Sequence, residues 1–280
     1  IGDSISLTGL KDTYKLVNIL HALPYDGATG VILKHVGDKT DKYVVCFRSA
    51  IETSSFVKIG LSGIGQKGHK WSEKATANQF LSSLYNNEYA QPLKDTIVKN
   101  WKEGSELIFL GYSMGSALAQ LAMYDLFVDQ GLTCTSSHLL IASPRVANDS
   151  FYAELATSAT PTRISTFIAA VNYNNVVYLD PVPLLDCFRD PLQIYVLGNL
   201  ECCQKKWHEG ILDPTHSCFN VLPINVYEIH QAALNTHKCS AVKVFGSFIG
   251  SMLQGTSIDI HTIAYFNAAN YGVMNTSVNL

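Results

Sequence analysis

The sequence of 280 residues has little charge and no long hydrophobic run. Charged residues make up 15% of it and the formal net charge is −3, which gives no basic surface for binding nucleic-acid phosphates. Apolar residues reach 47%, yet no apolar run extends over the roughly 18 residues that a membrane-spanning helix needs. We therefore expect neither a nucleic-acid partner nor a transmembrane segment.

The sequence also lacks internal repeats, low-complexity tracts and linkers rich in Pro or Ser. This absence indicates one domain over residues 1–280, because α/β folds often exceed 200 residues as a single unit. Cysteine occurs seven times, an odd number, and the spacing imposes no disulfide framework. The cellular compartment stays open, with a secreted or endomembrane location favoured.

The first hundred residues predict a helix, a β-hairpin and a second helical stretch. Residues 11–22 space their apolar side chains like one face of a helix. The β-branched runs 31–36 and 42–47 are separated by turn residues and predict two antiparallel strands. Residues 76–101 then have a helical pattern with two interruptions. The face residues of the first predicted helix are Leu16, Ile19 and Leu20, and the interruptions of the second fall near Asn86 and Pro92.

The centre of the chain predicts a strand, a helix and another strand. The continuous apolar run 106–110 is typical of a strand buried on both faces. Helix-forming residues follow from 116 and end at Gly131, and 138–143 is a further apolar strand. A strand, helix and strand in succession form a parallel crossover, so we predict an α/β fold with a central, mostly parallel sheet.

Residues 111–115, GYSMG, match the pattern G-x-S-x-G between the predicted central strand and the helix after it. A sharp turn between strand and helix exposes a serine hydroxyl at the C-terminal edge of a sheet. Side chains at Gly111 or Gly115 would collide with the adjoining strand and helix. The context therefore indicates that Ser113 is a nucleophile, against the alternative of a chance match in a core turn.

A serine nucleophile needs a histidine as base and an acid that orients the histidine, and both follow the serine in this type of fold. Asp180 is the favoured acid, because it ends an apolar strand-like run and precedes Pro181. Asp186 and Asp190 are alternatives, and a turn-capping role is the alternative for Asp180 itself. His261 is the favoured base and His216 the second choice among the five histidines after Asp180, which are His208, His216, His230, His237 and His261.

A patch rich in Cys and His follows residue 200, but its spacing argues against zinc. Adjacent cysteines rarely bind one zinc ion together, and the patch has neither a C-x-x-C nor an H-x-x-x-H pair. Disulfides to Cys187 or Cys239 are the better prediction. Two glycosylation sequons begin at Asn148 and Asn275, which matter only in a secreted protein. The members of the patch are Cys202, Cys203, His208, His216 and Cys218.

Six short motifs occur along the chain, which are VVCFRSA, GHKW, GYSMGSALAQLA, IASPRVAN, NNVVYLDPVP and DIHTIAYF. They resemble the class 3 lipase family, which contains fungal and plant triacylglycerol lipases and phospholipases A1 of the α/β-hydrolase fold. They occur in the order of the family and cover roughly residues 30–270. The resemblance implies the α/β-hydrolase fold, a triad of Ser113, Asp180 and His261, and no metal or organic cofactor.

The sequence departs from the family pattern where the oxyanion hole is expected. The family has FRG followed by Thr or Ser, whereas here Ser49 replaces the glycine and Ala50 replaces the hydroxyl residue. The backbone N–H groups of Ala50 and Met114 remain as donors, and loss of one donor costs on the order of 100-fold in rate. Tyr112 in place of the family's histidine is a milder change.

The predicted function is hydrolysis of lipid acyl esters at a membrane or droplet surface, through an acyl-enzyme. Residues 51–65 are either an apolar lid or an ordinary packed loop, and residues 241–254 are favoured as a core or acyl-pocket helix over a membrane anchor. A short-chain esterase or phospholipase A1 fits the same residues. A catalytically weak lipase-like binding module and a serine peptidase are rivals, and the oligomeric state is not indicated.

Overall fold

The structure is a computed structural model that describes eight stretches of the chain. The chain divides into two compact units, each described separately below. The first unit contains Ile1–Leu140 and Val146–Ile164, and the second contains Ile141–Arg145 and Ser165–Leu280. One domain over residues 1–280 stays a prediction. The described residues are 4–6, 13–22, 28–37, 41–49, 68–173, 176–179, 193–198 and 220–223.

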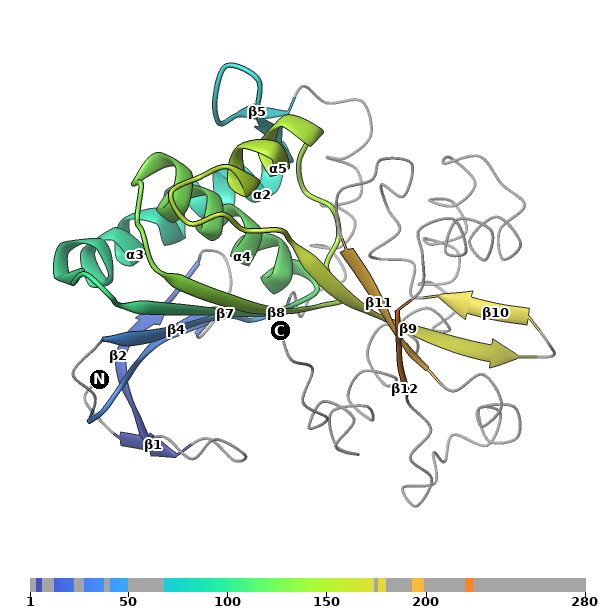
Figure 1. Ribbon diagram of the computed structural model, residues 1–280, viewed down its shortest axis with the longest axis horizontal. Helices are drawn as coiled ribbons and strands as arrows, with labels where there is room; N and C mark the ends of the chain where they lie inside the picture. Colours follow the sequence, from blue (N-terminus) through green and yellow to red (C-terminus); the bar gives the residue numbers. More distant parts are fainter. Residues whose placement is uncertain are drawn as a thin grey trace. The chain divides into compact units, whose positions relative to one another are not determined.

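The strands of the first unit follow one another in the order β1-β2-β3-β4-β7-β8 (Figure 1). The strands from β1 to β4 pair antiparallel, and β4 pairs parallel with β7. The predicted hairpin and both predicted central strands are confirmed. Their bounds are β1 Ser4–Ser6, β2 Thr13–Leu20, β3 Gly30–His35, β4 Lys42–Phe47, β7 Glu106–Tyr112 and β8 Thr135–Ile141.

The described helices of the first unit lie on one face of these strands (Figure 1). Helix α4 packs on β4 and β7, and α3 packs on β2. All residues of α4 are buried, so this helix lies at the centre of the core. The helical elements are α2 Gln79–Leu84, the π-helical turn η1 Tyr85–Tyr89, α3 Ala90–Thr96, the 3-10 turn η2 Val98–Asn100, α4 Met114–Tyr124, the π-helical turn η3 Asp125–Asp129 and α5 Asp149–Ala156.

The helical stretch predicted over 76–101 begins at Gln79 and is modified at its predicted interruptions. Near Asn86 the chain widens into the π-helical turn η1 before continuing as α3. Pro92 lies in α3, where it cannot donate the hydrogen bond to the carbonyl of Glu88 that a regular helix requires. A widened turn just before a proline accommodates this loss without ending the helix.

The helix predicted over residues 11–22 is wrong, because Thr13–Leu20 forms strand β2. The register of β2 on β3 shifts between Leu16 and Asn18, so Val17 is an extra residue in a β-bulge. Because of the bulge, Leu16 and Ile19 pair with β3 residues of one apolar cluster although they lie three positions apart. That spacing imitates the periodicity of a helix.

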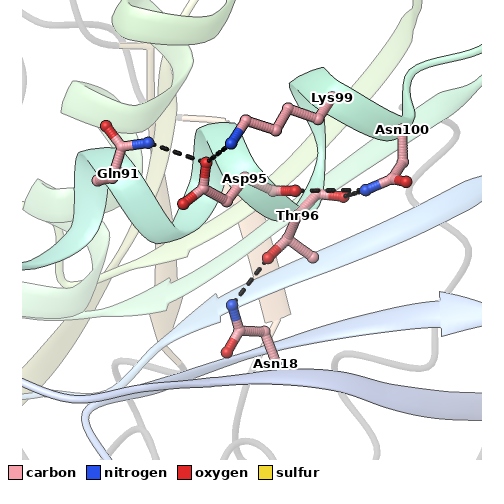
Figure 2. A network of polar contacts seen from close by, with 6 residues as sticks. All are labelled: Asn18, Gln91, Asp95, Thr96, Lys99 and Asn100. Carbon is pink, nitrogen blue, oxygen red and sulfur yellow. Dashed lines mark hydrogen bonds and ion pairs between the residues drawn. The ribbon is translucent and has the colours of Figure 1, made fainter.

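Asn18, on the other side of the bulge, points toward α3. Its side-chain amide donates to the Thr96 hydroxyl at 2.7 Å, at the end of that helix (Figure 2). The Asn100 amide donates to the backbone carbonyls of Asp95 and Thr96, which a helix end leaves without partners. A hydrogen bond from Lys99 lowers the pKa of the exposed Asp95 carboxyl. This network therefore joins the end of α3 to the sheet.

A short hairpin, β5 His69–Lys70 and β6 Thr76–Ala77, completes the described part of the first unit. Asn148 holds it beside α5: its side-chain nitrogen donates to the carbonyl of Lys74 at 2.8 Å, and its oxygen accepts from the N–H of Thr76 at 3.1 Å. The same oxygen accepts from the N–H of Phe151 at 3.2 Å, which caps α5. Asn148 thus caps the start of α5 and holds the β5-β6 hairpin against it.

The second unit is described as backbone strands. β9 pairs parallel with β11, while β10 pairs antiparallel with β9, and β12 pairs antiparallel with β11. The strand predicted before Asp180 is confirmed as β10, which ends at Leu179. In the described part of the chain no helix has the length and apolarity to cross a membrane. The bounds are β9 Ser165–Tyr173, β10 Val176–Leu179, β11 Gln193–Gly198 and β12 Asn220–Pro223.

Candidate active site

Ser113 is the single residue between the end of β7 and the start of α4. Its backbone has φ 55° and ψ −120°, a conformation that residues other than glycine rarely adopt. Such a residue costs of order 1–3 kcal/mol and persists only where its surroundings hold it. Its side chain is 1% exposed. The predicted sharp turn between strand and helix is therefore present, with strain located on the candidate nucleophile.

The two glycines of the motif permit this turn, for the reason expected from the sequence. A β-carbon at Gly111 would lie 2.6 Å from the carbonyl oxygen of Gly115 and from the backbone of Ser116. A β-carbon at Gly115 would lie 2.2 Å from the carbonyl oxygen of Phe47, at the end of β4. Neither position has room for a side chain, so the turn can close only with glycine at both.

One predicted donor of the oxyanion hole lies at the start of α4, which packs against the end of β4. Met114 is the first residue of α4, where helix N–H groups point outward and the helix dipole favours negative charge. Close by, the N–H of Arg48 donates to the carbonyl of Thr29 at 2.8 Å, which fixes the chain leaving β4. Ala50, the other predicted donor, lies outside the described residues.

The remaining predicted site residues are not described. Asp180 follows β10 directly, and neither it nor His261 has a described position. The candidate lid 51–65, the apolar segment 241–254 and the Cys/His patch also lie outside the described residues. The structure therefore describes Ser113 and Met114 of the predicted site, and the triad stays a prediction.

Two residues near the strand ends were missed by the sequence reasoning. Ala142, directly after β8, has φ 52°, and its N–H donates to the carbonyl of Phe167 at 2.8 Å. Tyr152 of α5 holds Val146: its hydroxyl accepts from the N–H of Val146 at 3.1 Å and donates to Gln120 at 2.7 Å. The available signal for this contact was Gln120, a polar residue within an apolar helix, which needs a hydrogen-bond partner when it is buried.

The described cysteines, Cys46 and Cys134, are free thiols. Burial raises the pKa of both, which keeps them protonated and weakly reactive. The cysteines predicted to form disulfides, Cys187 and Cys239, lie outside the described residues. Within the described stretches, no group of three or more His, Cys, Asp or Glu side chains is arranged to hold a metal ion.

Comparison with known proteins identifies the family. The model of the family "Lipase (class 3)" matches residues 44–186, about half of the chain, from β4 through the Ser113 turn to the residues after β10. The chain belongs to the class 3 lipase family. The predicted family and its α/β-hydrolase fold are thereby confirmed.

Several solved fungal lipases are similar to this class 3 lipase chain. The Rhizomucor miehei lipase propeptide complex is 17% identical with a TM-score of 0.49, covering 66% of this chain and 57% of that chain. A mutant form of MDLA from Penicillium cyclopium is 18% identical, with 80% and 77% covered and a TM-score of 0.46. The lipase from Rhizopus microsporus var. chinensis is 23% identical, with 55% and 53% covered and a TM-score of 0.41.

At these identities and TM-scores, the assignment rests on the family match and not on the individual lipases. The match to the Rhizomucor miehei chain spans less than two thirds of that chain. Among curated protein sequences, none matches this one significantly.

Proposed function

We propose that this chain is a serine esterase that hydrolyses acyl esters of lipids through an acyl-enzyme. The observation that carries the proposal is the backbone of Ser113, strained at φ 55° between β7 and the fully buried helix α4. A structural serine has no need of this conformation, whereas a nucleophile must project its hydroxyl from a sharp turn. Membership of the class 3 lipase family supports the lipid ester as substrate.

The proposed reaction has two steps. Ser113 Oγ attacks the ester carbonyl while His261 takes its proton, and Asp180 orients the histidine. His261 then protonates the leaving alcohol, and the acyl group stays on Ser113. A water molecule, deprotonated by His261, releases the acid and restores the hydroxyl. The end of β10 at Leu179 supports the acid, because it puts Asp180 immediately after a strand.

The oxyanion of each step needs hydrogen-bond donors, for which we propose the N–H groups of Met114 and Ala50. Contact between Gly115 and the carbonyl of Phe47 supports this assignment, since it brings the start of α4 against the end of β4. Because Ala50 has no hydroxyl, the hole has backbone donors where the family adds a side-chain donor. We expect Ala50→Thr to raise kcat, by up to the order of 100-fold that one donor contributes.

The absent hydroxyl also favours a second function, a lipase-like binding module that retains the fold without turnover. Ser49 and Ala50 together replace the two residues that the family pattern has after the arginine. Such a module would bind lipid esters and release no product. A serine esterase of short chains or a phospholipase A1 would instead show turnover with a different preference for chain length and head group.

The deciding experiment is hydrolysis of p-nitrophenyl esters of increasing acyl length by the wild type and Ser113→Ala. The matched control is Ser116→Ala, which removes a buried hydroxyl three residues along α4. We expect activity in the wild type and the control and none with Ser113→Ala, and loss also with His261→Ala and Asp180→Asn. The absence of turnover on every chain length, with folded protein, would favour the binding module.

A further inference from the structure

Asp125 is a buried carboxylate at the point where α4, the helix after Ser113, passes into the π-helical turn η3. It is 2% exposed and directly follows Tyr124, the last residue of α4. This position is unfavourable, because burial removes the carboxylate from water. A charge in such a position requires partners that hold it, and often serves to fix how elements fit together.

Three side chains hold this carboxylate. The Tyr85 hydroxyl donates to Oδ2 at 2.9 Å, and the Lys94 ammonium lies 3.1 Å from Oδ1. Gln130 donates to Oδ1 at 3.2 Å. Burial, together with the Asp125 charge, raises the pKa of Tyr85 well above its usual value, so its hydroxyl stays a donor. Tyr85 and Lys94 both belong to the helical stretch α2-η1-α3, which Asp125 therefore ties to α4.

The contact joins two irregular points of the helices. Tyr85 is the first residue of the π-helical turn η1, and its carbonyl accepts from the N–H of Ala90. Asp125 is the first residue of the π-helical turn η3, and its carbonyl accepts from the N–H of Gln130 at 2.8 Å. The contact between Tyr85 and Asp125 therefore lies where both helices leave regular α-helical geometry, so an axial shift of either helix would separate the two side chains.

The other end of α4 allows almost no displacement. Gly115 touches the backbone of Phe47 so closely that a β-carbon would not fit. The helix between these two ends is about 16 Å long and buried throughout, so it transmits an axial shift as a stiff body. The strain at Ser113 would relax if α4 moved, and it is kept only if the helix is held at both ends.

We propose that Asp125, held by Tyr85 and Lys94, is a positioning residue for the nucleophile. It fixes the axial position of α4 and thereby keeps Ser113 in its strained conformation. The inference rests on the proposed function of Ser113, and it adds a role for a network whose nearest residue is twelve positions from the nucleophile along the chain. Asp125 contacts no reacting atom in this proposal.

The test is the substitution Tyr85→Phe, which removes one hydroxyl and keeps the ring. The probe is a p-nitrophenyl alkylphosphonate: Ser113 Oγ forms a bond to phosphorus, the bond to p-nitrophenolate breaks, and the serine proton passes to His261. We expect the rate of this reaction and kcat for the matching ester to fall by about tenfold or more, with KM unchanged within about twofold, because misplacement affects the reacting geometry and not binding. Rates are measured per folded molecule, well below each unfolding midpoint.

The matched control is Lys99→Gln, which breaks the ion pair of Lys99 with Asp95 at 2.6 Å on the exposed side of α3 (Figure 2). It should react at the rate of the wild type. If Tyr85→Phe does not fold, Asp125→Asn takes its place with the same expected loss. A folded variant that reacts at the wild-type rate, even with a lowered midpoint, would show a merely structural network and overturn the proposal. An unreactive wild type would instead refute the proposed function, and the positioning role with it.

Discussion

Gly115 and Phe47 touch through their backbones: a β-carbon on Gly115 would lie 2.2 Å from the carbonyl oxygen of Phe47. Their contact joins the start of α4 to the end of β4, the two segments that carry Met114 and lead to Ala50. The distance between the start of α4 and the end of β4 is therefore set by backbone against backbone. No side-chain rotamer can adjust it.

Gly115→Ala should accordingly disrupt the contact between the start of α4 and the end of β4. The added methyl group would force α4 away from β4, at a cost of about 3 kcal/mol or more in the free energy of unfolding. We expect hydrolytic activity to disappear with it. Urea unfolding measures the stability, and Ser116→Ala in the same helical turn should lose about 1 kcal/mol at most. Wild-type stability and activity in Gly115→Ala would show that the contact is not rigid.

Replacement of Ser113 should separate backbone strain from side-chain chemistry. Both Ser113→Gly and Ser113→Ala lack the hydroxyl, but only glycine adopts φ 55° and ψ −120° without strain. After allowance for the greater freedom of glycine in the unfolded chain, Ser113→Gly should be more stable than Ser113→Ala by about 1 kcal/mol. Chemical unfolding of the two inactive variants measures the difference. Equal stabilities would contradict the presence of strain.

Asn148 should behave as a structural residue and not as a glycan acceptor. Asn148→Ala removes one donated and two accepted hydrogen bonds between α5 and the β5-β6 hairpin, for an expected loss of about 2 kcal/mol. Asn148→Asp keeps both accepted bonds and should lose less. Ser150→Ala removes the sequon without touching these bonds, so in a glycosylating host it should match the wild type in thermal midpoint. A destabilised Ser150→Ala would point to a glycan instead.

His138 should make the fold sensitive to mild acid. Burial lowers the pKa of His138 to about 4 from the ordinary 6.5. Between these two pH values the unfolded chain therefore binds a proton at this histidine, and the folded chain does not. Stability should fall as the pH drops from about 6.5 to 4, by up to roughly 3 kcal/mol. His138→Gln should remove most of this dependence, whereas His21→Gln, an exposed position, should keep it. Unfolding curves recorded across this pH range measure the effect. The same pH dependence of stability in both variants would refute the prediction.

The sequence predicted the centre of the fold because its signals there are local. The apolar strand 106–110, the alanine-rich helix after it and the paired glycines each impose one structure at short range. The strand β2 was mistaken for a helix because the bulge at Val17 puts Leu16 and Ile19 on one side, and a pattern of period two was no longer visible. Periodicity alone cannot reveal an extra residue.

The candidate site was predictable only where backbone geometry follows from glycine and proline. Gly111 and Gly115 predicted the turn at Ser113. The role of Asp125 could not be predicted, because its partner Tyr85 is forty positions away in the sequence. The left-handed backbone of Ala142 was equally hidden, since alanine carries no preference for it. Long-range pairs and strained alanines become visible only in three dimensions.

The extra residue in β2 has a consequence for chain length. Val17 is unpaired, and its neighbours Leu16 and Asn18 pair with the consecutive β3 residues Leu33 and Ile32. Its removal would therefore restore regular pairing and leave every other paired side chain of β2 on its present face of the sheet. The apolar cluster and the hydrogen bond from Asn18 to Thr96 would both be kept. At this position the strand can lose one residue without a change of register.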